Sequence, residues 1–512
     1  MIRIFRRYAY PAKSIAAWPT LLLVIGLIVL IGLIGLIQAC DSSNASLTER
    51  KAAHDDAIAS RIYHSGGVFS GKELCPESAW DTITPIDSLN PPPKESEPEM
   101  TVKGMQQFIK DKGIKSVDEF LTYLPAHFRN NFSLVEKTIS AGSASLEYPR
   151  IILFGSDGHF MMDLPTDPND HHYTHIPVMQ LDTQTGHWEL SQFDFSEEQP
   201  IVRRNLAKCR TCHGDANARP MWGTFWEWEG IFGDSVVAGP RPEAMHHTHA
   251  IKMNDIMRGE GGSTRFDILK WRKTQMRRGG ARMLAEHDFG PELVISNIVM
   301  GSATALGTYL RLSHHDDYQA ERHEMLLAYY LHRLEKQTRY VKADNSKARF
   351  EYARDTNLAI SQQLATQAAP ALDPMLLRMG IDTSEAFSLA TIHGQDEPKP
   401  DWSMGASDLY DMLMLQVLDE LRRDDPIVAG ILATTALEQP LYLCPDTVQN
   451  VDEMIDLKML HLFHLKGEAR YQVHRVYYPR DLDDIYEQVF LPIADSLIPY
   501  LQSKQPLAVA MQ

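Results

Sequence analysis

The sequence predicts a mainly α-helical protein with a small antiparallel β sheet ahead of the helices. From about Gly239 onward, apolar residues recur at helical spacing over most of the chain. Upstream, Arg150–Phe154 is an apolar run typical of a buried strand, and two further apolar segments flank the turn Asp182–Gly186. The helices expected in the second half span 243–258, 263–288, 290–313, 318–342, 350–367, 405–423, 447–466 and 481–502.

The elements of the first half follow from local signals. Residues 101–125 predict two short helices, the first with Met105 and Ile109 on its apolar face and the second beginning after Ser116. The strands 178–181 and 187–190 are expected to pair as a hairpin.

Composition narrows the class of protein. The chain has 512 residues, of which 44% are hydrophobic and 23% charged, as in an ordinary globular protein. Its formal net charge of −17 argues against nucleic-acid binding, which requires a basic surface. We therefore expect no nucleic-acid partner.

The N-terminus is the local exception to this polar composition. Four basic residues (Arg3, Arg6, Arg7 and Lys13) precede the unbroken apolar run Leu21–Ile37, a pattern typical of an export signal or a membrane anchor. The run ends in Ile37-Gln38-Ala39-Cys40-Asp41, which resembles the lipobox of bacterial lipoproteins, with Gln38 in place of the usual small residue. The resemblance implies that Cys40 is lipidated and that Asp41 retains the protein at the inner membrane.

The alternative is an uncleaved membrane-spanning anchor in which Cys40 is incidental. In both interpretations the protein is attached to the membrane, by a lipid or by a helix. Because the basic end stays in the cytoplasm, the rest of the chain is expected on the periplasmic side of a bacterial inner membrane.

One motif carries specific chemistry. Residues 209–213 read Cys-Arg-Thr-Cys-His, the attachment signature of a c-type haem. Two thiols three positions apart can reach the two vinyl groups on one edge of a porphyrin, and the following imidazole can bind the iron. The sequence thus predicts one covalent haem c, held by Cys209 and Cys212, with His213 as an iron ligand. A structural zinc site and a thioredoxin-like redox pair are weaker alternatives, because no second Cys-x-x-Cys and no βαβ pattern are present.

The segment around this motif resembles a set of largely uncharacterised proteobacterial single-haem c-type cytochrome-like proteins. Their pattern is CxxCHG, then Arg-Pro-x-Trp, then Trp-x-Gly-x-x-Gly. Here the segment 209–233 reads CRTCHGDANARPMWGTFWEWEGIFG. The likeness covers roughly residues 117–235. It implies a cytochrome c-like haem-binding segment embedded in a larger helical protein, and it implies no particular reaction.

Residues that follow the motif are candidates for contacts with the haem. Trp222 could wall the porphyrin or donate its indole N–H to a propionate, and Arg219 could pair with a propionate. In the helix expected at 243–258, Met253 is the first candidate for the sixth iron ligand and His249 the second, because they share one face with two further methionines. Ordinary core packing of a methionine stripe is the alternative.

Other histidines and cysteines carry weaker signals. His171, His172 and His175 fall in a polar loop and could bind a metal or the haem iron, but a solvated loop is favoured. Cys75 and Cys444 form a disulfide or remain two buried thiols.

These signals divide the chain into five regions. They are a signal peptide or anchor (1–39), a tether with a Pro-rich connector (40–100), an α+β region with the hairpin (101–200), a haem c-binding region (201–315) and a helical C-terminal region of unknown role (316–512).

Electron transfer to an unidentified redox partner is the function that the sequence favours, with no catalytic residue assigned. A haem enzyme of peroxidase or oxygenase type, or a haem-based gas sensor, is the alternative if the distal side of the iron is open.

Overall fold

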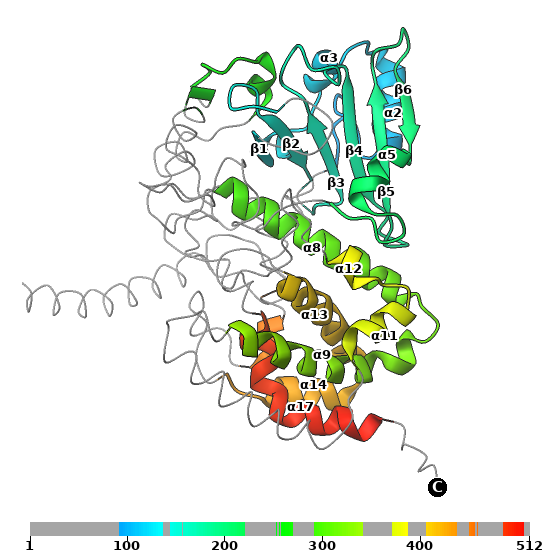
Figure 1. Cartoon of the computed structure of the whole chain (residues 1–512), viewed down its shortest axis with the longest axis vertical. Helices are drawn as coiled ribbons and strands as arrows, with labels where there is room; N and C mark the ends of the chain where they lie inside the picture. The colour runs from blue at the N-terminus through cyan, green and yellow to red at the C-terminus, as the bar shows by residue number, and fades with distance from the viewer. Residues whose placement is uncertain are drawn as a thin grey trace, which may run out of the picture. The chain divides into compact units, whose positions relative to one another are not determined.

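The computed structural model contains a β sheet with helices before and after it in the sequence (Figure 1). The described residues are 92–136, 144–155, 157–220, 252, 255–256, 258–269, 291–340, 371–387, 406–437, 450–455, 458 and 485–505.

A six-stranded antiparallel sheet precedes the motif. Its strands run side by side in chain order (Figure 1), so each strand pairs with the next one along the chain. They are β1 (Phe132–Val135), β2 (Arg150–Phe154), β3 (Phe160–Leu164), β4 (His175–Leu181), β5 (Trp188–Asp194) and β6 (Ile201–Arg204). The expected strand and hairpin are confirmed. The sheet is larger than predicted, and β6 carries it past residue 200, where the α+β region was expected to end.

Three short helices cover one face of this sheet. They are α2 (Val102–Lys112), α3 (Val117–Leu121) and α4 (Ala126–Asn130). The Thr101 and Ser116 hydroxyls accept hydrogen bonds from the amides of Gly104 and Glu119 at 2.9 and 3.1 Å, so each caps its helix. Both helices expected in residues 101–125 are confirmed. Their apolar side chains form one core with alternate residues of the strands, including Leu134, Ile151, Leu153, Met162, Val178 and Phe193.

The opposite face of the sheet is half apolar. Phe154, Met161, Leu181, Trp188 and Leu190 lie at one end of it and belong to the same core as the long helix α8 (Pro291–Ser313). The hairpin glycine Gly186 meets this helix closely, because a Cβ at that position would lie 2.2 Å from the Gly307 carbonyl oxygen.

The other half of the same face is polar. Strand alternation and register place Asp163, His175, Gln192, Asp194 and Arg203 there, beyond the residues that pack against α8. We call these residues, together with Arg150, the polar half of the sheet.

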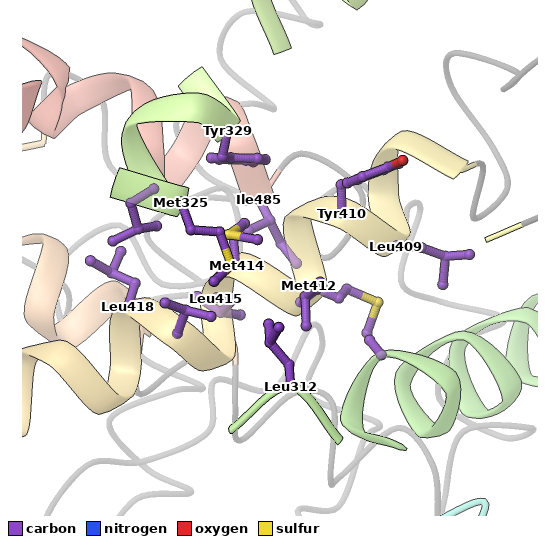
Figure 2. Packing of buried hydrophobic residues seen from close by; sticks show 14 of the residues in the cluster. Leu312, Met325, Tyr329, Leu409, Tyr410, Met412, Met414, Leu415, Leu418 and Ile485 are labelled. Atoms are coloured by element: carbon purple, nitrogen blue, oxygen red, sulfur yellow. The ribbon is translucent and has the colours of Figure 1, made fainter. Parts of the chain in front are cut away.

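The helical core forms around α13 (Ala406–Asp424), whose side chains from Leu409 to Leu421 are almost all buried. Around it lie α9 (Tyr318–Tyr340), α11 (Leu372–Arg378), α12 (Thr383–Ala386), α14 (Pro426–Thr434), a π-helix, η3 (Tyr486–Phe490), and α17 (Leu491–Lys504). Figure 2 shows Met325 and Tyr329 of α9 converging with Ile485 on Met414 of α13. Packing from several sides therefore holds α13.

Several expected helices agree with the structure. α8, α9, α13 and the segment from Ile485 to α17 fall within or beside the ranges 290–313, 318–342, 405–423 and 481–502. α11, α12 and α14 were not expected. The helix expected at 350–367 lies outside the described residues, as do most of 243–258 and 447–466.

The helix expected at 263–288 is wrong at its start. Residues 264–268 form a short 3₁₀ helix, η2 (Thr264–Ile268), and Leu269 is extended. The buried guanidinium of Arg265 donates to the Asp118 carboxylate and to the carbonyls of Pro165 and Tyr173, at 2.7, 2.5 and 2.8 Å. These tertiary bonds, which sequence periodicity does not encode, fix the local conformation.

Among the helices that the structure describes, none is both long and apolar enough to cross a bilayer. The apolar run Leu21–Ile37 lies outside the described residues.

Candidate functional site

The Cys-x-x-Cys-His motif forms its own short helix, α5 (Ala207–His213), directly after the last strand. The chain leaves β6 through Asn205, whose φ of 49° lies in the left-handed region that asparagine tolerates. Gly214 ends the helix with a φ of 90°. The six strands thus lead the chain into the motif, and the helix places position 212 beside position 209 on one face.

Cys209 is half-buried and packs against the core that α8 shares with the sheet. The backbone of Cys212 lies in α5, while its side chain is outside the described part of the structure. Most other residues of α5 are exposed. The helix therefore anchors one thiol against the protein and leaves much of its own surface open.

His213 is held by a closed loop of the chain. Its ring nitrogen Nδ1 lies 2.9 Å from the carbonyl oxygen of Arg219, and the Arg219 amide donates to the His213 carbonyl at 3.1 Å. Within the loop, Arg210 pairs with Asp215 at 2.9 Å. This ring of bonds fixes the imidazole relative to α5.

The bond to Arg219 also determines which nitrogen of His213 is basic. A carbonyl oxygen only accepts, so Nδ1 must carry the proton and Nε2 keeps its lone pair in the neutral ring. No hydrogen bond to Nε2 is found among the described residues. A histidine that donates through one nitrogen to a backbone carbonyl is oriented to bind a metal through the other.

The charge state of His213 suits the same role. Burial lowers the pKa of the imidazole, although the bond to the Arg219 carbonyl partly opposes this effect. The positive charge of Arg219 also lowers the pKa, and Asp163 on β3 raises it slightly. The ring is therefore neutral at pH 7, the form in which imidazole binds a metal.

Arg219 is buried, and its guanidinium holds the loop to the helical core. Its Nε donates to the Glu385 carbonyl at the end of α12 at 2.9 Å, and Nη1 donates to the Pro220 carbonyl at 3.0 Å. The expected pairing of Arg219 with a haem propionate stays a prediction. Arg219 lies six positions after His213 in the sequence, but the sequence did not predict a contact between them.

The remaining predicted site residues lie outside the described part of the chain. These are Cys40, Trp222, His249 and Met253. Cys75 and Cys444 lie outside it as well. The sixth-ligand, indole and lipidation hypotheses therefore stay predictions.

The loop between β3 and β4 differs from the solvated loop favoured by its sequence. His171 is exposed, but the side chains of His172 and His175 are only 12% and 16% exposed. The Asp170 side chain is fully buried beside them. Burial of His172 lowers the pKa of its imidazole, and the charges of His171 and of Lys208 on α5 lower it further. The charge of Lys208 on the motif helix thus acts on this loop.

A second polar cluster lies in the helical core, where the sequence suggested no chemistry. Asp411 of α13 is fully buried, accepts a hydrogen bond from the Tyr329 hydroxyl and pairs with Arg333 at 3.0 Å. The Arg333 guanidinium lies 4.8 Å from the centre of the Tyr486 ring in the π-helix. Burial, then the charge of Asp411, raises the pKa of Tyr329, which stays protonated. An aspartate in an otherwise apolar stretch of a helix was the sequence signal for this cluster.

No known protein family matches the chain, and no curated protein or solved structure matches it significantly.

Proposed function

We propose that this protein is a membrane-anchored c-type cytochrome of the bacterial periplasm. It binds one haem c through Cys209 and Cys212, takes His213 as an iron ligand, and transfers single electrons to and from a redox partner. The haem supplies the one-electron couple when bound, and the protein supplies attachment, orientation and a buried environment that tunes the potential.

The observation that carries the proposal is the orientation of His213. In this motif the histidine must present a lone pair while its other nitrogen is held in place. The bond from Nδ1 to the Arg219 carbonyl meets that requirement. A thioredoxin-like redox pair does not require a histidine in a fixed orientation. It also follows a strand of a βαβ unit, whereas the four-residue strand β6 before α5 is the edge strand of an antiparallel meander.

The residues present fit a covalently attached porphyrin. The half-buried Cys209 lies on the side of α5 that packs against the core, and His213 follows one turn later on the same short helix. Trp222, two residues after Pro220, is the predicted residue to wall the porphyrin or to donate to a propionate.

Absorption spectroscopy of the full chain, produced with the haem c maturation machinery, tests the proposal. Covalent haem should remain with the polypeptide after denaturation. It should be lost in the double variant Cys209→Ala/Cys212→Ala and kept in Cys75→Ser. A wild-type protein without covalent haem would contradict the proposal and return the two thiols to zinc or redox chemistry.

The same sample separates electron transfer from the alternative of a haem enzyme or gas sensor. Sharp reduced α and β bands that carbon monoxide leaves unchanged indicate a filled sixth position, as electron transfer requires. A high-spin spectrum that shifts with carbon monoxide indicates an open site. In that case peroxide turnover distinguishes an enzyme from a sensor.

A further inference from the structure

We propose a second metal site in the loop between β3 and β4, where Asp170, His171 and His172 bind a divalent transition-metal ion of the zinc type. Three ligand atoms, one from each residue, lie within 4.8 Å of one another. The site is separate from the thiol motif, and the inference does not depend on the presence of haem.

Two distances between the proposed ligand atoms match the edge of a tetrahedral site. The Nδ1 atoms of His171 and His172 each lie 3.5 Å from Oδ1 of Asp170. Ligands about 2.0–2.2 Å from zinc at tetrahedral angles are separated by roughly 3.3–3.6 Å. The third edge, between the two histidines, is within 4.8 Å and can be adjusted by rotation of the exposed His171 side chain.

Two histidine nitrogens in this region lack hydrogen bonds. Nδ1 of His172 and Nδ1 of His175 are both buried, and neither makes a hydrogen bond in the described structure. Buried ring nitrogens normally have a hydrogen-bond partner or a metal, so we expect these two nitrogens to bind one. The rings of His172 and His175 are 5.6 Å apart, which makes His175 the candidate for a fourth ligand.

His175 is oriented as metal-binding histidines usually are. Its Nε2 lies 3.3 Å from Oδ1 of Asp194 on the neighbouring strand, and its Nδ1 is the nitrogen without a hydrogen bond. A carboxylate that accepts from one ring nitrogen makes the other a better ligand. Asp194 is itself held by Ser196 and Arg203.

Side chains of both charges surround Asp170. Arg150 approaches Asp170 at 3.5 Å, but its stronger bonds go to Asp163, at 2.8 and 2.7 Å. Lys208 of α5 is the other positive charge near His172. Arg203, which pairs with Asp194, is a third cation, so three positive charges face the three carboxylates of Asp163, Asp170 and Asp194.

The loop is also fixed before any ion binds. Arg265 donates to the carbonyls of Pro165 and Tyr173, which lie on either side of the proposed ligands. Thr166 donates to the Pro149 carbonyl at 2.8 Å, and the His172 amide donates to Oδ1 of Asp170 at 2.8 Å. A fixed loop reduces the entropy lost on binding.

Equilibrium dialysis of the full chain against Zn²⁺, after EDTA treatment and removal of the chelator, tests the site. Wild-type protein should bind one more zinc ion per chain than the double variant His171→Ala/His172→Ala. The matched control is His159→Ala, which removes a single histidine paired with Asp157 at 3.0 Å elsewhere on the sheet and should bind as wild type. Calcium, which prefers oxygen ligands, should not compete.

The single variant His171→Ala guards against misfolding, because this side chain is 74% exposed. This variant should keep the circular dichroism spectrum of the wild type. Its affinity for zinc should fall at least about tenfold, because even the loss of a residue that only hydrogen-bonds to a metal ligand lowers metal affinity by about that factor. Equal zinc stoichiometry in wild type and the double variant overturns the proposal. A changed haem spectrum in the double variant, with that stoichiometry unchanged, also overturns it and makes this loop the source of an iron ligand.

Discussion

At the scale of single residues, two side chains are held by partners that fix their charge. The His213 imidazole is neutral and oriented by the Arg219 carbonyl. Asp425, the cap of α14, is ionised and accepts hydrogen bonds from the Tyr500 hydroxyl, from His323 at 3.0 Å and from the Ile427 amide at 2.9 Å. The orientation of His213 bears on function, and the charge of Asp425 bears on stability.

Replacing His213 should separate attachment of the haem from ligation of the iron. In His213→Ala, Cys209 and Cys212 keep their thiols, so covalent haem should remain where maturation proceeds, while the reduced spectrum loses its sharp low-spin bands. Absorption spectra of the oxidised and reduced protein measure this. The exposed His314→Ala is the control and should leave the bands unchanged. Unchanged bands in His213→Ala would show that another residue holds the iron.

Asp425 should make stability depend on pH. Burial raises the pKa of this carboxyl, but the hydrogen bonds from Tyr500 and His323 and those from the α14 amides outweigh it and lower the pKa to about 2. Between about pH 4 and pH 2 the unfolded chain binds more protons than the folded one. The contribution of Asp425 is therefore complete above pH 4 and disappears as the pH falls towards 2.

The variant Asp425→Asn keeps the capping oxygen and removes the charge. Its free energy of unfolding should be lower by about 1–2 kcal/mol at pH 7, and the difference from wild type should vanish near pH 2. Urea unfolding at several pH values measures both. Asp424→Asn, next to it, is the control: Asp424 is half exposed, and its partner Arg322 keeps a second carboxylate partner in Glu420, so this change should cost under about 1 kcal/mol. A difference that does not change with pH would contradict the ionised state of Asp425.

At the scale of elements, the β4–β5 hairpin packs very closely against α8 at Gly186. A Cβ on Gly186 would meet the Gly307 carbonyl at 2.2 Å and the Arg311 amide at 2.9 Å. Arg311 then closes the contact by donating to the Gly186 carbonyl at 2.7 Å. The hairpin that leads to the motif is thereby fixed to the helical core.

Alanine at two glycines separates the cost of this contact from the cost of backbone strain. Gly186 and Gly113 have similar φ values of 75° and 66°, but a Cβ on Gly113 would meet nothing within 4 Å. Gly113→Ala should cost about 1–2 kcal/mol from its left-handed backbone alone. Gly186→Ala should cost roughly 1–3 kcal/mol more, because α8 must move away. Thermal or urea unfolding measures both, and equal losses would show that the hairpin and α8 separate freely.

At the scale of the whole molecule, the proposal joins a membrane anchor to a periplasmic haem domain. Periplasmic attachment of haem c requires export, and the apolar run Leu21–Ile37 after a basic N-terminus is the predicted signal for it. The formal net charge of −17 suits a partner with a basic surface.

The form of the anchor can be determined by mass and lipid labelling. If Cys40 is lipidated, the mature chain begins at this residue, has lost residues 1–39 and incorporates a labelled fatty acid. Cys40→Ser should abolish the label completely and keep residues 1–39, whereas Cys75→Ser should leave both unchanged. An unlabelled wild-type chain that retains its N-terminus would instead establish a membrane-spanning helix.

Elements with strong local signals could be predicted from the sequence. It predicted the strand 150–154, the hairpin around Asp182–Gly186, the two capped helices after residue 100 and the long helices near 300, 330 and 415, because caps, turns and periodicity are local. The thiol motif and its histidine were also evident from five consecutive residues. It did not predict β1, β3, β6 or α14, which are only 4, 5, 4 and 9 residues long and therefore carry weak local signals.

The contacts that hold the site depend on tertiary packing and could not be predicted from the sequence. The bond from His213 to the Arg219 carbonyl depends on a loop conformation, and the anchoring of Arg219 depends on α12, more than 160 positions along the chain. In the same way, Arg265 holds the 165–173 loop, and the sheet buries His172 and His175, which the sequence alone favoured as solvated. Spacing in the sequence selects the residue types that a cofactor needs, whereas burial and the choice of hydrogen-bond partner are set by long-range contacts that close only when the sheet and the helices pack together.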